Sequence, residues 1–163
     1  MMSERAIVNR KREMHSLARH KEIHMSVETR QNIVKKLYAR LNEKDHSVMR
    51  ETMHETLKDH ASHGSTDGLA AHEAFVRASH GAFSDLKFTV AQVFGEGDLV
   101  CARGRMTGTN DGSFMGAPPT GRKIDITWTA VYRFEGDKIA ERWLNGDDLG
   151  FMTQLGFVTP PGR

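Results

Sequence analysis

The sequence has a single cysteine and no long hydrophobic run. Cys101 has no second cysteine to pair with, so an intrachain disulfide is excluded. No apolar stretch approaches the roughly 20 residues that a membrane helix requires, and the first residues lack the apolar centre of a signal peptide. These absences predict a location in the cytoplasm and no membrane partner. The length of 163 residues fits one domain with a sizeable core.

A strong charge of either sign is also missing, since 23 basic residues face 21 acidic ones. Residues 1–27 carry six of the basic residues and three of the acidic ones, so the rest of the chain is close to neutral. A nucleic-acid-binding domain would be expected to present a basic face with aromatic residues. The sequence therefore predicts no nucleic-acid partner.

Apolar spacing predicts helices in the first half of the chain and strands in the second. A helical period covers residues 3–24, 26–42, 45–57 and 69–83, with Ser26 and Asp45 as N-caps. From residue 85 the period becomes two, and strands at 99–109, 123–134 and 138–145 follow, separated by glycine turns and a long loop at 110–121. A short helix at about 148–155 ends the pattern. Helices followed by antiparallel strands indicate an α+β fold.

Three stretches resemble the signature of the SnoaL-like polyketide cyclases. Residues 108–122 read G-T-N-D-G-S-F-M-G-A-P-P-T-G-R, which is similar to the family's G-T-x-x-G-x-F-x-G-x-x-P-T-G-[KR]. Residues 136–156 resemble its closing G-x-K-I-x-E-x-W-x3-D-x2-G-x3-Q-L-G, and residues 82–86 resemble A-F-P-D-L with Ser84 in place of the proline. The resemblance implies the α+β cone of nuclear transport factor 2-like proteins, with helices and a curved sheet around a cavity. We expect a basic helical extension at 1–27, the cone domain at 28–157 and a tail at 158–163.

The resemblance also implies a cofactor-free reaction. In this family an aspartate in the cavity is the acid and base of an intramolecular aldol closure of an aromatic polyketide methyl ester, without a metal or a cofactor. The spacing W-x3-D-x2-G maps this aspartate onto Asp147, with Asp148 as the neighbouring alternative. Burial in an apolar cavity would raise the pKa of such a carboxyl group and make it a stronger base. The competing role for Asp147 is to cap the last helix.

His60 is a second catalytic candidate, because it resembles the position of a histidine at the cavity edge of many family members. A neutral imidazole there could bind a substrate carbonyl or hold the base in place, and the alternative is an ordinary loop histidine. Histidine pairs elsewhere lack the ligand set of a zinc site, so no metal is predicted. The residues predicted to bind the substrate are Trp143, Phe83, Phe114, Arg103, Trp128, Glu141 and Asn145.

Two functions remain open at this level. The first is an enzyme, a polyketide cyclase-like lyase or isomerase, that acts on a hydrophobic carbonyl compound through Asp147. The second is a non-catalytic ligand-binding or dimerisation module on the same fold, since one fold hosts many functions. A small or polar cavity, or an Asp147 carboxylate directed at solvent, would favour the second. A homodimer is predicted through the exposed sheet, with Ile124, Ile126 and Trp128 or their alternates at the contact.

Overall fold

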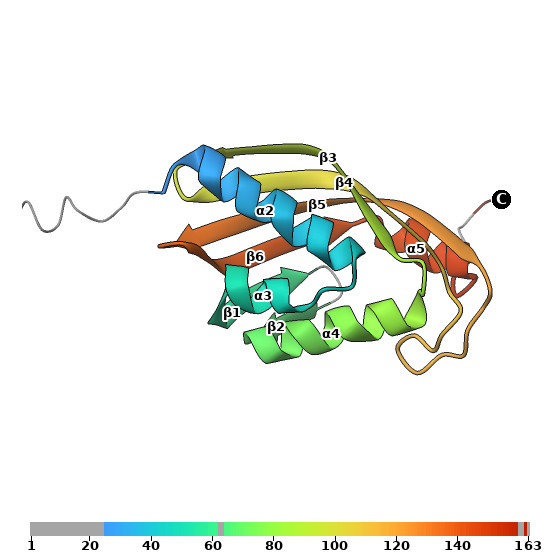
Figure 1. Ribbon diagram of the computed structural model, residues 1–163. Coiled ribbons are helices and arrows are strands. Elements are labelled where there is room, and N and C mark those ends of the chain that lie inside the picture. The colour runs from blue at the N-terminus through green and yellow to red at the C-terminus, as the bar shows by residue number, and fades with distance from the viewer. Residues whose placement is uncertain (1–24, 62–63, 160–161, 163) are drawn as a thin grey trace, which may run out of the picture.

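Figure 1 shows a curved sheet with helices packed along one of its faces. This computed structural model describes residues 25–61, 64–159 and 162, so the helix predicted at 3–24 lies outside the described residues. The described elements follow one another in this order: α2 (Val27–Asn42), α3 (Ser47–Thr52), β1 (Met53–Ala61), β2 (Gly64–Asp67), α4 (Leu69–Ala82), β3 (Lys87–Glu96), β4 (Leu99–Thr109), β5 (Lys123–Glu135), β6 (Lys138–Gly146) and α5 (Asp148–Leu155).

The six strands form one mixed sheet in the order β2-β1-β6-β5-β4-β3. β1 runs parallel to β6, and every other neighbouring pair is antiparallel. Helices α2, α3 and α4 lie on the concave side of this sheet, and α5 lies near one end (Figure 1). The α+β cone of the nuclear transport factor 2-like fold is confirmed.

α2 is held by its cap and by an apolar stripe. The side chain of Ser26 accepts a hydrogen bond from the backbone N–H of Thr29 at 3.1 Å, which confirms the predicted N-cap. Val34, Leu37 and Leu41 recur at helical spacing and are buried against the sheet. This placement of the stripe sets one wall of the space between helix and sheet.

The helix predicted at 45–57 is wrong in its second half. α3 ends at Thr52, and Met53 and Leu57 belong to β1 instead. β1 pairs with β6 on one side and with the short β2, which precedes the helix predicted at 69–83, on the other. The pairing with β6 joins segments more than 80 residues apart, and such tertiary pairing overrides a local period.

β5 confirms the predicted alternation. Its even-numbered residues from Ile124 to Phe134 are buried on the side of the helices, and the odd-numbered ones lie on the opposite side, which we call the outer face. The pairing of β5 with β6 sets Arg142 beside Tyr132 and Trp143 beside Val131. Arg142 therefore faces the helices, and Trp143 lies on the outer face.

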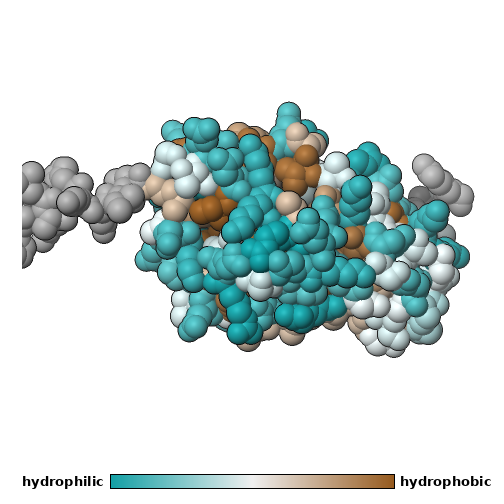
Figure 2. Space-filling model, in the orientation of Figure 1, coloured by the Kyte–Doolittle hydropathy of each residue, from teal (hydrophilic) through white to brown (hydrophobic). Residues whose placement is uncertain are grey.

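The surface in the orientation of Figure 2 is mostly hydrophilic, with hydrophobic residues in small separate groups. The apolar side chains gather instead in two buried clusters. The larger cluster lies between α2, α3 and the sheet, and the smaller one surrounds Phe83 and Leu155 near α5.

Candidate functional site

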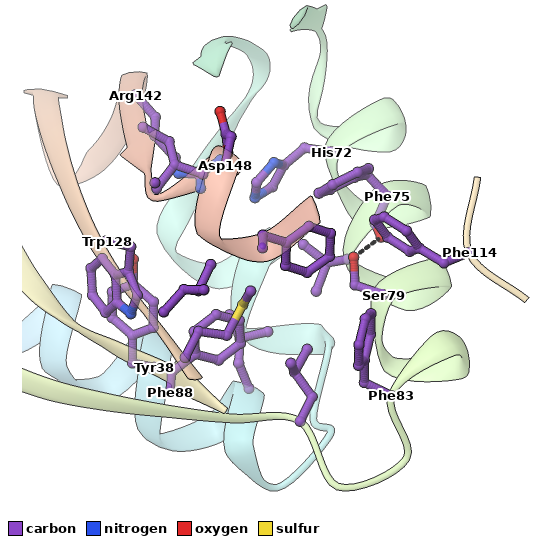
Figure 3. Close-up of a pocket in the computed structure, with 18 of the residues that line it drawn as sticks. Tyr38, His72, Phe75, Ser79, Phe83, Phe88, Phe114, Trp128, Arg142 and Asp148 are labelled. Carbon is purple, nitrogen blue, oxygen red and sulfur yellow. Dashed lines mark hydrogen bonds between the residues drawn. The ribbon is translucent and has the colours of Figure 1, made fainter. Parts of the chain in front are cut away.

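A cavity of about 460 Å³ lies between α2, α4, α5 and the inner face of the sheet (Figure 3). Pockets that bind small molecules usually measure about 300–1,000 Å³. Most of its lining is apolar or aromatic: Leu37, Leu41, Phe75, Val76, Phe83, Leu86, Phe88, Met106, Phe114, Met115, Ile126, Trp128, Leu144, Phe151 and Met152. The cavity therefore suits a hydrophobic ligand.

Three phenylalanines build one aromatic end of the cavity. The ring centroids of Phe83 and Phe114 are 5.6 Å apart, those of Phe114 and Phe151 5.4 Å, and those of Phe83 and Phe151 5.9 Å. All three pairs are tilted or edge-to-face, an arrangement that aromatic rings favour. Phe83 and Phe114, both predicted to bind the substrate, therefore lie together in the cavity lining.

The glycine-rich motif at 108–122 positions Phe114. Asn110 is fully buried, and its amide donates to the carbonyl of Gly112 at 2.9 Å while its Oδ1 accepts from the N–H of Thr120 at 2.8 Å. Gly112 packs so closely on α4 that a Cβ there would lie 2.1 Å from the carbonyl oxygen of Gly81. These constraints clamp both ends of the loop and direct Phe114 toward the cavity.

A polar cluster on three elements lies beside this apolar space. Arg142 of β6 donates from Nη1 to both carboxylate oxygens of Asp59 on β1, at 2.8 and 2.9 Å. His72 of α4 bonds the same carboxylate through Nδ1 at 2.8 Å. Tyr38 and Tyr132 are joined by their hydroxyl groups at 2.5 Å, and both line the cavity with His72 and Arg142.

Burial sets the protonation of this cluster. Burial alone would raise the pKa of Asp59, but the hydrogen bond from His72 and the charge of Arg142 outweigh it and lower that pKa below its usual value. Burial lowers the pKa of His72, and the hydrogen bond to Asp59 offsets this only in part. Burial raises the pKa of Tyr38 and of Tyr132. Near neutral pH the cluster thus holds an ionised aspartate, a neutral histidine and two neutral tyrosines.

Three of the predicted site residues line the cavity, namely Phe83, Phe114 and Trp128. Trp128 is 6% exposed and stacks on Tyr38 with ring centroids 4.6 Å apart, so it belongs to the core as well as to the cavity wall. The core role and the ligand-binding role proposed for this residue are therefore compatible.

The remaining predictions fall outside the cavity lining. Glu141, Trp143 and Asn145 alternate with the inward-facing Arg142 and Leu144, so they lie on the outer face of β6. His60 reaches the same outer face from β1, where its Nε2 donates to Glu141 at 2.9 Å and its ring stacks on Trp143. Arg103 is exposed on β4 and bonds Gln92.

Asp147 caps α5. Its Oδ1 accepts from the N–H of Gly150 at 2.8 Å, and its side chain is exposed. A Cβ at residue 150 would come within 2.1 Å of Asp147 Oδ2, which explains the D-x2-G spacing of the motif in structural terms. Asp148 is the aspartate of this pair that lines the cavity, and it is also exposed, so it lies where the cavity meets solvent.

Sequence reasoning missed the polar cluster itself. Asp59 has no sequence signal beyond its position next to His60, and His72 is one of nine histidines with no distinguishing spacing. The inward position of Arg142 follows from the alternation of β6, but only once the direction of that alternation is known. Tyr132 could be placed inward from the pattern of β5 alone.

Comparison with known proteins fits this geometry. The model of the SnoaL-like polyketide cyclases matches residues 31–155. The chain belongs to this family. No curated protein matches the chain. The match spans every described helix and strand that contributes to the cavity, except the first residues of α2.

Solved structures share the SnoaL-like fold. A candidate SnoaL-like polyketide cyclase of Jannaschia sp. CCS1 is 28% identical, with a TM-score of 0.71 over 80% of this chain and 92% of that one. IdmH of Streptomyces antibioticus, a candidate polyketide cyclase, is 27% identical, with a TM-score of 0.67 over 77% and 96% of the two chains. AclR of Streptomyces galilaeus, a candidate hydroxylase, is 24% identical, with a TM-score of 0.75 over 82% and 100%. At that identity AclR supports the fold alone.

The described part of the SnoaL-like chain consists of residues 25–61, 64–159 and 162. No group of three or more histidine, cysteine, aspartate or glutamate side chains is arranged there to hold a metal ion. Across the same residues, none of the helices combines the length and apolar character needed to span a membrane.

Proposed function

We propose that this chain catalyses a cofactor-free acid–base reaction of the cyclase type, an intramolecular aldol closure of a hydrophobic polyketide-like carbonyl compound. The observation that carries the proposal is the mostly apolar cavity with ionisable side chains, His72, Arg142 and Asp148, in its lining. Apolar walls hold a flat carbon skeleton, and a few polar groups fix its orientation. The family membership supports the same reaction class.

We assign the acid–base role to Asp148, the alternative to Asp147 within the closing motif, because Asp148 lines the cavity. The Asp148 carboxylate takes a proton from the carbon next to a carbonyl group, and the C–H electron pair becomes an enolate. The enolate carbon attacks a second carbonyl of the same molecule, whose π electrons move to its oxygen. The alkoxide then takes the proton back from Asp148, so the product is an isomer of the substrate.

The test compares two neighbouring variants, Asp148→Asn and Asp147→Asn. The substrate is a synthetic anthraquinone with a β-keto methyl ester side chain, and ring closure is followed by chromatography. A general base contributes about 10²–10⁴-fold, so D148N should lose at least about a hundredfold in rate. Asparagine caps helices as well as aspartate does, so D147N should keep its fold and its activity. Full activity in D148N would contradict the assignment.

A non-catalytic binding module is the second candidate. The exposed, capping position of Asp147 favours it, because the residue that the resemblance marks as catalytic is engaged in a structural hydrogen bond. A binding module would take up the anthraquinone ester with a measurable affinity and leave it unchanged. The same chromatographic assay, paired with calorimetry, separates the two functions.

We also infer that two copies associate through the outer face of the sheet. The odd-numbered residues of β5, which alternate with Ile124, Ile126 and Trp128, occupy that face. The half-buried Val131 and Trp143 lie next to each other on it. Replacing Val131 by glutamate would place a charge in such a contact. Light scattering should then report a monomer for V131E and a dimer for the wild type, and a monomeric wild type would contradict the inference.

A further inference from the structure

His72 offers the cavity one defined hydrogen-bonding atom. Its ring extends from α4 into the cavity, as Figure 3 shows, although the residue as a whole is only 4% exposed. Nδ1 is committed to Asp59 at 2.8 Å. None of the described residues forms a hydrogen bond with Nε2. This nitrogen also remains accessible, since it is absent from the set of fully buried side-chain atoms that have no partner. Nε2 is thus the ring nitrogen available to a ligand.

The partners of His72 determine which nitrogen carries the proton. Asp59 accepts two hydrogen bonds from Arg142, and an ionised carboxylate can only accept, so the bond with Nδ1 requires a proton on Nδ1. The groups around the ring are Asp59 from β1, Arg142 from β6 and Glu73 beside it on α4. Burial and the charge of Arg142 lower the pKa of His72, and together they outweigh the two carboxylates, which raise it. A neutral ring with hydrogen on Nδ1 leaves a lone pair on Nε2.

We propose that the cavity recognises ligands that present a hydroxyl group, a phenol or an enol, to Nε2 of His72. The lone pair on Nε2 accepts a hydrogen bond from O–H, but it cannot donate one to a ketone oxygen. Nε2 therefore favours a hydroxyl group over a ketone. Arg142, which lines the same cavity, only donates and suits a carbonyl or an anionic oxygen instead. A β-dicarbonyl compound in its enol form carries both kinds of oxygen. The inference rests on the proposed function only in placing the ligand in this cavity.

The asparagine variant His72→Asn isolates this atom. The asparagine amide nitrogen lies close to the position of Nδ1, so it can still donate to Asp59, whereas the acceptor at Nε2 is removed. The probes are 2-naphthol and 2-fluoronaphthalene, which have nearly the same size but differ in the hydroxyl donor. Titration calorimetry on the full chain measures both dissociation constants at pH 7.5 for the wild type and for H72N.

The affinity of 2-naphthol relative to 2-fluoronaphthalene should fall about three- to tenfold in H72N, which corresponds to the loss of one net hydrogen bond. Comparing the ratio in two proteins cancels the difference in hydrophobicity between the probes. An unchanged ratio, or a wild type that binds neither probe, would overturn the proposal.

Nitrogen NMR on histidine-labelled wild type gives a second readout that does not depend on the folding of H72N. The His72 signals should identify Nδ1 as the protonated nitrogen, and the Nε2 signal should shift with 2-naphthol and stay in place with 2-fluoronaphthalene. A proton on Nε2 in the free protein would also overturn the proposal. Neither readout involves turnover, so an active D148N variant would refute the proposed function and leave this preference standing.

Discussion

Asp59 and Arg142 form a buried, two-point ion pair between the parallel strands β1 and β6. Arg142 Nη1 lies 2.8 Å from one carboxylate oxygen and 2.9 Å from the other, and the two side chains are 7% and 12% exposed. The residues are also direct partners in the strand register. Because His72 bonds the same carboxylate, this pair connects the sheet to α4 and fixes the wall of the cavity.

Removing one partner of this pair should destabilise the fold strongly. Arg142→Met would leave the Asp59 carboxylate buried without its cation, and breaking a buried pair in this way costs about 3–5 kcal/mol. Urea unfolding should record a loss of that order. Lys36→Met is the matched control, because Lys36 of α2 pairs with Glu51 of α3 and both side chains are exposed, so solvent screens the charges. Equal losses in both variants would contradict the argument.

The stability of the chain should fall as the pH is lowered from about 7 to 5. Burial lowers the pKa of His72, His46 and His80, so the folded state resists protonation while the unfolded chain takes up protons near the usual histidine pKa of about 6.5. The unfolded state then binds more protons, and the free energy of unfolding decreases with decreasing pH. Urea unfolding at pH 7.5 and 5.5 should show this decrease, and H72N should show a smaller one.

The lowered pKa of Asp59 adds a second pH range, more acidic than the first, in which the stability of the fold depends on pH. A carboxylate with a lowered pKa stabilises the fold above its unfolded pKa of about 3.9, and this contribution is lost as the pH falls through the folded value. The histidine effect begins near the unfolded histidine pKa of about 6.5, well above the unfolded aspartate pKa of about 3.9, so it can be measured first. A stability that stayed constant between pH 7.5 and 5.5 would contradict the histidine assignment.

The parts of the fold that follow from local pattern could be predicted, and the site could be predicted only in part. The alternation of β5 correctly put Trp128 and Tyr132 on one face of the strand, and the structure shows that this face is buried along its whole length. The same reasoning on β6 gave the right alternation but did not determine which set of residues faces the cavity. Trp143 was expected there, whereas Arg142 occupies that side. The direction depends on the register with β5, which is a tertiary property.

The polar cluster was hidden for a related reason. Asp59 and His72 are 13 residues apart. Asp59 lies on a strand whose first part was predicted as a helix, and His72 lies on a helix that also buries the polar residues Glu73 and His80. Their contact exists because β1 pairs with β6 beneath α4, and no short-range spacing in the sequence encodes that pairing. The closing motif was identified correctly, but its D-x2-G spacing has the geometry of a helix cap.

The cap role of Asp147 predicts a stability effect. Asp147→Ala removes the acceptor for the Gly150 N–H and should lower the free energy of unfolding by about 0.5–2 kcal/mol, the usual cost of losing an N-cap. Asp147→Asn keeps an acceptor oxygen and should lose much less. Thermal unfolding of the two variants measures the difference, and equal melting temperatures would show that the cap contributes nothing.

Truncating Phe114 should weaken ligand binding without removing the hydroxyl preference. Phe114→Ala deletes one of three rings at the aromatic end of the cavity, where it contacts Phe83 and Phe151. Lost apolar contact area then reduces the affinity for 2-naphthol and for 2-fluoronaphthalene alike, by several-fold, while their ratio stays that of the wild type because His72 is intact. Phe94→Ala is the control, since Phe94 is 56% exposed on β3 and does not line the cavity. Calorimetry on both variants distinguishes the outcomes. A loss of affinity confined to F114A places the probes in the cavity. An equal loss in F94A would mean that the probes bind the surface instead.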